Sequence, residues 1–214
     1  MAGEPLIPRI GTPENPIRIA VLFSGSGTGM NALFQHQGNQ SCTHKTVLSI
    51  TNKSDAGGIM FANERGIPVE IETVDPILAK QERRIEQERR IMKHLEQYNV
   101  EVIILSGYMR ILSEEFVSAY YPKIINIHPS LLPAFPGADA HSDVLSSQVR
   151  VSGCTVHVVD SGMDSGTILG QSRVPVFTGD SRASLAKRVQ IEEHRLYPEI
   201  IDLICSGHEV VLED

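Results

Sequence analysis

The chain has 214 residues and a formal net charge of −7, so we expect one large domain or at most two small ones, with no general nucleic-acid surface. No apolar run reaches the ~18 residues that a membrane span needs, and the first 16 residues lack the apolar segment of a signal peptide. The three cysteines lie far apart without CxxC or zinc-finger spacing, which is typical of reduced thiols. We therefore predict a cytoplasmic protein with no membrane partner, a flexible lead-in over 1–16 and a tail over 206–214.

The first half of the chain alternates predicted strands and helices. An apolar strand over 17–23 is followed by a glycine-rich turn and a helix over 30–37. Such alternation predicts a doubly wound parallel sheet. The further elements are a strand at 46–51, a helix at 56–65, a short strand at 69–71, a charged helix at 78–98, a strand at 102–105, a short helix from Ser113 and a fifth strand that carries Asn126 and His128.

The pattern changes after the fifth strand. A short helix is predicted near 142–147, and two strands over 153–159 and 167–176 are joined by a short loop, which favours antiparallel pairing. A final helix is predicted over 181–205. We therefore expect a single α/β domain over 17–205, with a Rossmann-like mixed sheet that is mostly parallel and has an antiparallel C-terminal portion.

The turn after the first strand, with glycines at 25, 27 and 29, could bind a phosphate. Backbone N–H groups and the positive end of the following helix suit an anion at such a turn. A dinucleotide fingerprint would need a glycine where Met30 stands, and a P-loop would need a GK[ST] sequence. The turn therefore indicates either a monophosphate site or only a tight connection between strand and helix.

Asn126 and His128 end the fifth predicted strand, and residues two apart in an extended segment point to the same side. Pro129 and Pro133 exclude a regular element just beyond, so the pair lies at the sheet edge where ligands bind. A buried His–Asn contact satisfied by the backbone would have the same sequence. If Asp164 converges on the pair, the group becomes an acyl-transfer centre with no nucleophilic side chain. Asn126 would donate to a carbonyl oxygen, and the carboxylate would fix the tautomer of His128.

Two further patterns bear on this edge of the sheet. The run 107–112 has an aromatic residue, a methionine, an arginine and two aliphatic residues, which could line a flat apolar pocket or pack onto the core. His128, His141 and Asp164 have the ligand types of a zinc site but lack a compact ligand pair, so no metal is expected.

Motifs along most of the chain resemble those of one family. The motifs are Ser24-Gly25-Ser26-Gly27, Gly107-Tyr108-Met109-Arg110-Ile111-Leu112, Asn126-Ile127-His128-Pro129-Ser130-Leu131-Leu132-Pro133, Asp164-Ser165-Gly166, and Arg188-Val189-Gln190 with Glu193-His194. They resemble the phosphoribosylglycinamide formyltransferase family of purine biosynthesis, within the folate-dependent formyltransferases. The resemblance implies transfer of a formyl group from 10-formyltetrahydrofolate to the amine of 5′-phosphoribosylglycinamide. It also implies small-molecule substrates only, and a monomer or homodimer.

The same resemblance implies residue roles. Asn126 would bond the formyl oxygen, His128 would donate a proton to the intermediate, and Asp164 would keep His128 cationic. The half 17–120 would bind phosphate, and the half 121–205 would carry catalysis and the folate. The implied ribonucleotide-binding residues are Gly27, Thr28, Gly29, Gln190 and Glu193. The implied folate-binding residues are Arg84, Met109, Arg110, Ile111, Leu112, Asn126, Asp160, Ser161, Gly162, Met163 and Asp164.

The chain departs from the family at two positions and leaves other functions open. The family usually has Asn where Gly29 stands, a role that Asn31 could take, and often His where Asp139 stands. A formyltetrahydrofolate hydrolase or a methionyl-tRNA formyltransferase would share the core, but each adds a domain for which we expect no room here. A non-catalytic nucleotide-binding module would keep the glycine loop but would not need three polar groups converging on one pocket.

Overall fold

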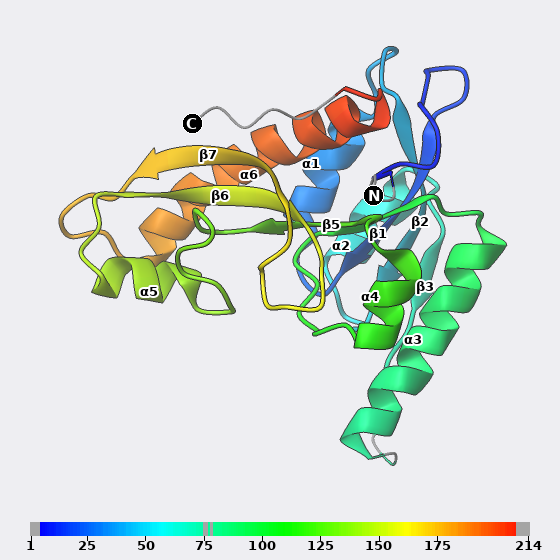
Figure 1. The fold of residues 1–214 in the computed structure, drawn as a ribbon, viewed down its shortest axis with the longest axis horizontal. Helices are drawn as coiled ribbons and strands as arrows, with labels where there is room; N and C mark the ends of the chain where they lie inside the picture. Colours follow the sequence, from blue (N-terminus) through cyan, green and yellow to red (C-terminus); the bar gives the residue numbers. More distant parts are fainter. Residues whose placement is uncertain (1–4, 75–76, 78, 209–214) are drawn as a thin grey trace.

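The computed structural model describes residues 5–74, 77 and 79–208. Its centre is a seven-stranded sheet with the order β3-β2-β1-β4-β5-β6-β7 (Figure 1). The first five strands are parallel, whereas β6 is antiparallel to both β5 and β7. The predicted mixed sheet is therefore confirmed. The strands are β1 (Ile17–Phe23), β2 (His44–Thr51), β3 (Val69–Ile71), β4 (Val102–Leu105), β5 (Ile124–His128), β6 (Val151–Val158) and β7 (Ile168–Pro175).

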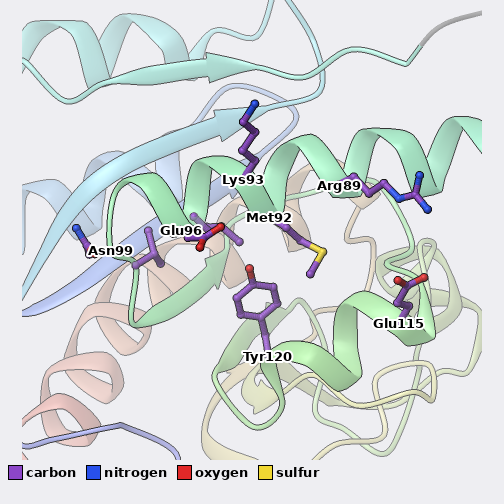
Figure 2. Close-up of a pocket in the computed structure, with 9 residues that line it drawn as sticks. Arg89, Met92, Lys93, Glu96, Asn99, Glu115 and Tyr120 are labelled. Atoms are coloured by element: carbon purple, nitrogen blue, oxygen red, sulfur yellow. The ribbon is translucent and has the colours of Figure 1, made fainter.

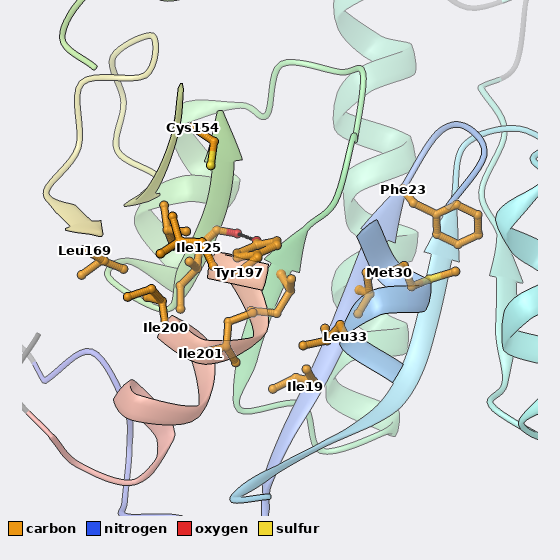
Figure 3. Packing of buried hydrophobic residues seen from close by; sticks show 14 of the residues in the cluster. Ile19, Phe23, Met30, Leu33, Ile125, Cys154, Leu169, Tyr197, Ile200 and Ile201 are labelled. Carbon is orange, nitrogen blue, oxygen red and sulfur yellow. Dashed lines mark hydrogen bonds between the residues drawn. The ribbon is translucent and has the colours of Figure 1, made fainter. Parts of the chain in front are cut away.

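Helices cover both faces of this sheet because its central strands are apolar on both sides. On β1, Ile19 and Val21 pack with α1, α2, α5 and α6, and the intervening Ala20 packs with α3 and α4 on the opposite face. Figure 3 shows part of the first core, which includes Leu33 of α1, Ile125 of β5 and Tyr197 of α6. None of the described helices is long and apolar enough to cross a membrane. The helices are α1 (Thr28–His36), α2 (Gly58–Glu64), α3 (Lys80–Gln97), α4 (Glu114–Tyr120), α5 (Ala140–Ser146) and α6 (Arg182–Cys205).

Element boundaries differ from the predicted ones by a few residues. β2 begins at His44 rather than at 46, and α5 begins at Ala140 rather than at 142. Pro198 lies inside α6 without ending the helix.

The segment 1–16, predicted to be a flexible lead-in, has contacts with the domain in its described part. Arg9 Nε donates to Glu101 at 2.7 Å, and Gly11 N donates to the carbonyl of Cys205 at 2.7 Å. Residues 1–4, and 209–214 of the predicted tail, lie outside the described residues.

Candidate active site

A cavity of about 580 Å³ lies at the C-terminal ends of β4 and β5. This size is typical of small-molecule sites. All the implied folate-binding residues except Arg84 line it: Met109, Arg110, Ile111, Leu112, Asn126, Asp160, Ser161, Gly162, Met163 and Asp164. Met109, Ile111 and Met163 are more than half exposed, so they form an open apolar mouth above the buried polar groups. Arg84, on α3, is not part of this lining.

A second hollow, of about 680 Å³, lies between α3 and α4 (Figure 2). Its described lining includes Arg89, Met92, Lys93 and Tyr120, but none of the predicted site residues. The larger hollow is therefore not the candidate active site, which is defined by converging polar groups rather than by volume.

His128 is 5% exposed, and both of its ring nitrogens face hydrogen-bond acceptors. Nε2 lies 2.9 Å from the carbonyl oxygen of Phe135, and Nδ1 lies 3.3 Å from Oδ2 of Asp164. A carbonyl and a carboxylate can only accept, so a proton on either ring nitrogen finds a partner here. The geometry therefore suits a histidine that donates a proton from the Nδ1 side.

Asp164 is fixed by its own backbone and by the neighbouring loop. Its φ of 52° is in the left-handed region, which is uncommon for residues other than glycine, although aspartate adopts it more often than most. Gly137 N donates to Asp164 Oδ2 at 2.8 Å. Within the same loop, Asp160 Oδ1 accepts from Gly162 N at 3.1 Å and from Ser165 Oγ at 2.9 Å. Asp164 is therefore held toward His128 before any ligand binds.

Asn126 is oriented by His157 on β6, a residue absent from the predicted site. The two residues face each other across β5 and β6, with Asn126 Nδ2 at 3.1 Å from His157 Nε2. His157 Nδ1 donates to the carbonyl of Val158 at 2.9 Å, so Nε2 is left as an acceptor. Burial lowers the pKa of His157, which keeps the imidazole neutral. The second hydrogen of Asn126 Nδ2 therefore remains for a ligand in the cavity.

The strands beneath these groups are joined by Tyr197 of α6. Its buried hydroxyl lies 2.9 Å from the carbonyl oxygens of both Leu105, at the end of β4, and Ile125, near the start of β5 (Figure 3). The single hydroxyl hydrogen can serve either carbonyl. Tyr197 thus fixes the spacing of the two strands that carry the cavity.

The glycine turn is shaped by close contacts that only glycine allows. Gly27 has a φ of 72°, and a Cβ there would lie 2.4 Å from Gly58 Cα. A Cβ on Gly29 would lie 2.8 Å from Ser106 Oγ, so a larger residue would require Ser106 to move. The side-chain oxygen of Asn31 is buried and has no hydrogen-bond partner in the described structure.

The implied ribonucleotide-binding residues come together from opposite ends of the chain. Gln190 Nε2, on α6, donates to Thr28 Oγ1, at the start of α1, at 3.0 Å. Glu193 lies one turn further along α6, and burial raises its pKa to about 7. Ser24 connects this group to the cavity, because its Oγ accepts from Met109 N at 2.8 Å. Arg188, in the same helical motif, instead pairs with Asp180.

Taken together, the mixed sheet and the cavity define a Rossmann-like α/β protein in which Asn126, His128 and Asp164 converge at the ends of the central strands. Residues 17–201 match the family model described as formyl transferase. The chain therefore belongs to the formyl transferase family, and the predicted resemblance is confirmed.

Three comparisons place the chain within this family. It is 35% identical to phosphoribosylglycinamide formyltransferase of Escherichia coli over 89% of this chain and 88% of that protein. It is 43% identical to the trifunctional purine biosynthetic protein adenosine-3 of Gallus gallus over 90% of this chain, but spans only 19% of that relative's length. The crystal structure of glycinamide ribonucleotide transformylase 1 from Symbiobacterium toebii aligns with a TM-score of 0.83 at 38% identity, covering 90% of this chain and 89% of that chain.

Proposed function

We propose that the chain transfers the formyl group of 10-formyltetrahydrofolate to the amine of 5′-phosphoribosylglycinamide, giving formylglycinamide ribonucleotide and tetrahydrofolate in purine biosynthesis. The observation that carries the proposal is the convergence of Asn126, His128 and Asp164 on one cavity beside the glycine turn. The names of the bacterial and chloroplast relatives support the choice of acceptor.

The cavity suits the proposed formyl donor. An apolar mouth of Met109, Ile111 and Met163 can cover a flat ring system, and the buried polar groups lie deeper. Arg84 does not line the cavity. A contact between Arg84 and the donor's glutamate, which the family resemblance implies, would therefore have to form outside it.

The proposed reaction forms one C–N bond and breaks another. Bound 10-formyltetrahydrofolate supplies the formyl group. The substrate amine attacks the formyl carbon and loses one proton, and the donor nitrogen gains one proton as its bond to that carbon breaks. Asn126 Nδ2 donates to the formyl oxygen as its negative charge grows, and His128 Nδ1, beside Asp164, moves the proton. Because both substrates are held side by side, no nucleophilic side chain is required.

The ribonucleotide is proposed to lie between α1 and α6. The phosphate would bind backbone N–H groups of Gly27, Thr28 and Gly29 at the start of α1. Gln190 already contacts Thr28 there, and Glu193 would accept hydrogen bonds from sugar hydroxyl groups. This arrangement directs the substrate amine from the phosphate site toward the cavity.

We propose small-molecule substrates, a cytoplasmic location and no nucleic-acid or membrane partner. The net charge of −7 disfavours binding to a polyanion. The cysteines are free and buried, which is consistent with a reducing compartment. Gel filtration would distinguish a monomer from a homodimer.

Two parallel assays test the proposal. Loss of 10-formyltetrahydrofolate is followed with and without 5′-phosphoribosylglycinamide, and the formylated ribonucleotide is identified by mass spectrometry. The proposal expects turnover only when both substrates are present. Turnover without the ribonucleotide would instead indicate a hydrolase, and binding without turnover in either assay would indicate a non-catalytic nucleotide-binding module.

A further inference from the structure

A second group of histidine, cysteine and aspartate side chains lies at the end of the sheet opposite the candidate active site. His36 ends α1, Cys42 and His44 lie at the start of β2, and Asp202 lies near the end of α6 (Figure 1). We call these four residues the His36–Asp202 cluster. No step of the proposed reaction uses them.

The ligand atoms of the cluster converge. One ligand atom each from His36, Cys42 and Asp202 lies within 4.8 Å of the other two, the one such group found among the described residues. His44 Nδ1 adds a fourth donor, 3.3 Å from Asp202 Oδ1 and 3.5 Å from Cys42 Sγ. His36 Nε2 lies 3.7 Å from Asp202 Oδ2.

These spacings are close to the edges of a tetrahedral zinc shell. With Zn–N and Zn–O bonds of about 2.1 Å and a Zn–S bond of about 2.3 Å, tetrahedral angles separate nitrogen and oxygen ligands by about 3.4 Å. The same geometry separates sulfur and nitrogen ligands by about 3.6 Å. The 3.5 Å contact between His44 Nδ1 and Cys42 Sγ agrees with these values. His36, whose side chain is 23% exposed, has to swing inward, and Asp202 has to present Oδ2 to the ion, to complete the shell.

The surroundings of Asp202 also suit a ligand. Its Oδ1 accepts hydrogen bonds from Thr43 N at 2.9 Å and from Thr43 Oγ1 at 2.8 Å. Outer partners of this kind orient metal-binding carboxylates. They leave Oδ2, on the side of His36, for a cation.

The charges of the cluster balance a divalent ion. A Cys42 thiolate and the Asp202 carboxylate carry two negative charges, and the two imidazoles bind as neutral ligands. Without an ion, burial raises the pKa of the Cys42 thiol to about 11, so the thiol keeps its proton. Binding would release that proton, because a coordinated thiol is deprotonated.

We propose that His36, Cys42, His44 and Asp202 bind one Zn²⁺ ion in a structural, four-ligand site. The ion would connect the end of α1, the start of β2 and the end of α6, which the sheet brings together from distant parts of the sequence. All four positions are filled by side chains, so the site would be closed to substrate and would stabilise the fold rather than take part in catalysis.

The test uses the full chain, stripped of metal under reducing conditions, with Zn²⁺ alone as the titrant. Calorimetry should show one tight equivalent, and Co²⁺ in its place should give a thiolate-to-metal charge-transfer absorption. Cys42→Ser should abolish that absorption. Loss of a residue that only hydrogen-bonds to a metal ligand costs about 10- to 100-fold in metal affinity. His36→Ala removes a ligand itself, so it should weaken Zn²⁺ binding by at least about 10-fold. His36 is partly exposed, and circular dichroism would verify that this variant folds.

Two controls locate the ion. His208→Ala removes an exposed histidine outside the cluster and should bind Zn²⁺ as the wild type does. His128→Asn should also bind Zn²⁺ normally. The proposal is overturned if the wild type gives no thiolate absorption, if binding survives in both Cys42→Ser and His36→Ala, or if binding is lost in His128→Asn, which would place the ion in the active site.

Discussion

The two ends of the sheet carry nearly the same chemical groups in opposite settings. The candidate active site pairs His128 with Asp164 at 3.3 Å, and the His36–Asp202 cluster pairs His44 with Asp202 at the same distance. The first pair lines an open cavity, whereas the His44 side chain is fully buried. A histidine–carboxylate contact therefore does not by itself mark a catalytic site. Access to a cavity distinguishes the two.

The carboxylates also differ in how many hydrogen bonds they already accept. Asp164 receives one backbone N–H, from Gly137, whereas Asp202 receives two donors from Thr43 on one oxygen. Burial opposes ionisation of Asp202, but hydrogen bonds from His44 and Thr43 outweigh it and hold the pKa of Asp202 well below its usual range. The proposed structural carboxylate is thus held mainly by Thr43 and His44, whereas the proposed catalytic one lines the cavity beside His128.

The strongest way to separate the two ends is to remove one histidine from each. His128→Ala should lower kcat by about 100- to 10,000-fold, because the general acid is lost while the cavity remains. His36→Ala, the matched histidine removal at the other end, should leave kcat unchanged. Steady-state kinetics with both substrates measures the contrast, and circular dichroism shows whether both variants fold. Comparable rates in His128→Ala and the wild type would exclude the proposed mechanism.

The charge of Asp164 gives the next largest effect. Asp164→Asn keeps the size and tolerates the left-handed backbone, but a neutral amide no longer stabilises the His128 imidazolium. We expect kcat to fall by about 100-fold with little change in either KM. Asp160→Asn is the control in the same loop, and it should change kcat far less. Equal losses in the two variants would mean that loop order, rather than the charge beside His128, governs the rate.

His157 should have a smaller effect, because it acts indirectly, through Asn126 and through Asp164, whose Oδ1 lies 3.7 Å from His157 Nε2. Loss of an oxyanion donor typically costs ~100- to 1,000-fold, so loss of the residue that orients the donor should cost less, about 10-fold in kcat. His157→Gln offers a carbonyl acceptor and should recover part of the rate lost in His157→Ala. A merely structural role would predict parallel losses of thermal stability and rate, with no recovery by glutamine.

The contrast between His128 and His157 shows how far sequence reasoning extends. Asn126 and His128 were predictable because residues two apart on a strand share a side, and the alternating elements correctly predicted the mixed sheet. His157 was a histidine in an otherwise apolar strand, and its role depends on the register that sets it opposite Asn126. In the His36–Asp202 cluster only Cys42 and His44 lie close together in the sequence, and the packing of α6 beside β2 brings Asp202 to Thr43.

At the His36–Asp202 cluster we expect a substitution to change thermal stability without changing kcat/KM. Asp202→Ala in metal-free protein leaves Thr43 and His44 without their acceptor, which should cost about 1–3 kcal/mol. That corresponds to about 2–4 °C in Tm per kcal/mol for a chain of this size. The pKa of Asp202 is lower in the folded chain than in the unfolded chain. Its contribution to the free energy of unfolding is therefore present at neutral pH and is lost as the pH falls through that lower pKa. The Tm difference should therefore shrink in acid, with kcat/KM unchanged at neutral pH. An unchanged Tm at pH 7 would contradict this assignment.

Glu193 should give the smallest effect, one that depends on pH. Burial raises its pKa from 4.5 to about 7, so the folded chain binds this proton more tightly than the unfolded chain does. The resulting stability is full below pH 4.5 and is lost as the pH rises through about 7. Glutamine at position 193 cannot ionise, so Glu193→Gln does not lose stability as the pH rises. The difference between its Tm and the wild-type Tm should therefore be larger at pH 8 than at pH 5.5, with the variant the more stable.

The same titration should govern ribonucleotide binding, because only the ionised carboxylate is a strong acceptor for sugar hydroxyl groups. The wild-type KM for the ribonucleotide should fall a few-fold as the pH rises through about 7. In Glu193→Gln that KM should stay nearly constant over the same range. The KM for the folate should not change with pH in this way in either protein. Glu192→Gln is the matched control, since Glu192 bonds Ser172 and hydrogen bonding lowers its pKa. If Glu192→Gln, rather than Glu193→Gln, removed the pH dependence of the ribonucleotide KM, then Glu192 would be the residue of α6 that accepts from the sugar hydroxyl groups, and the assignment to Glu193 would be wrong.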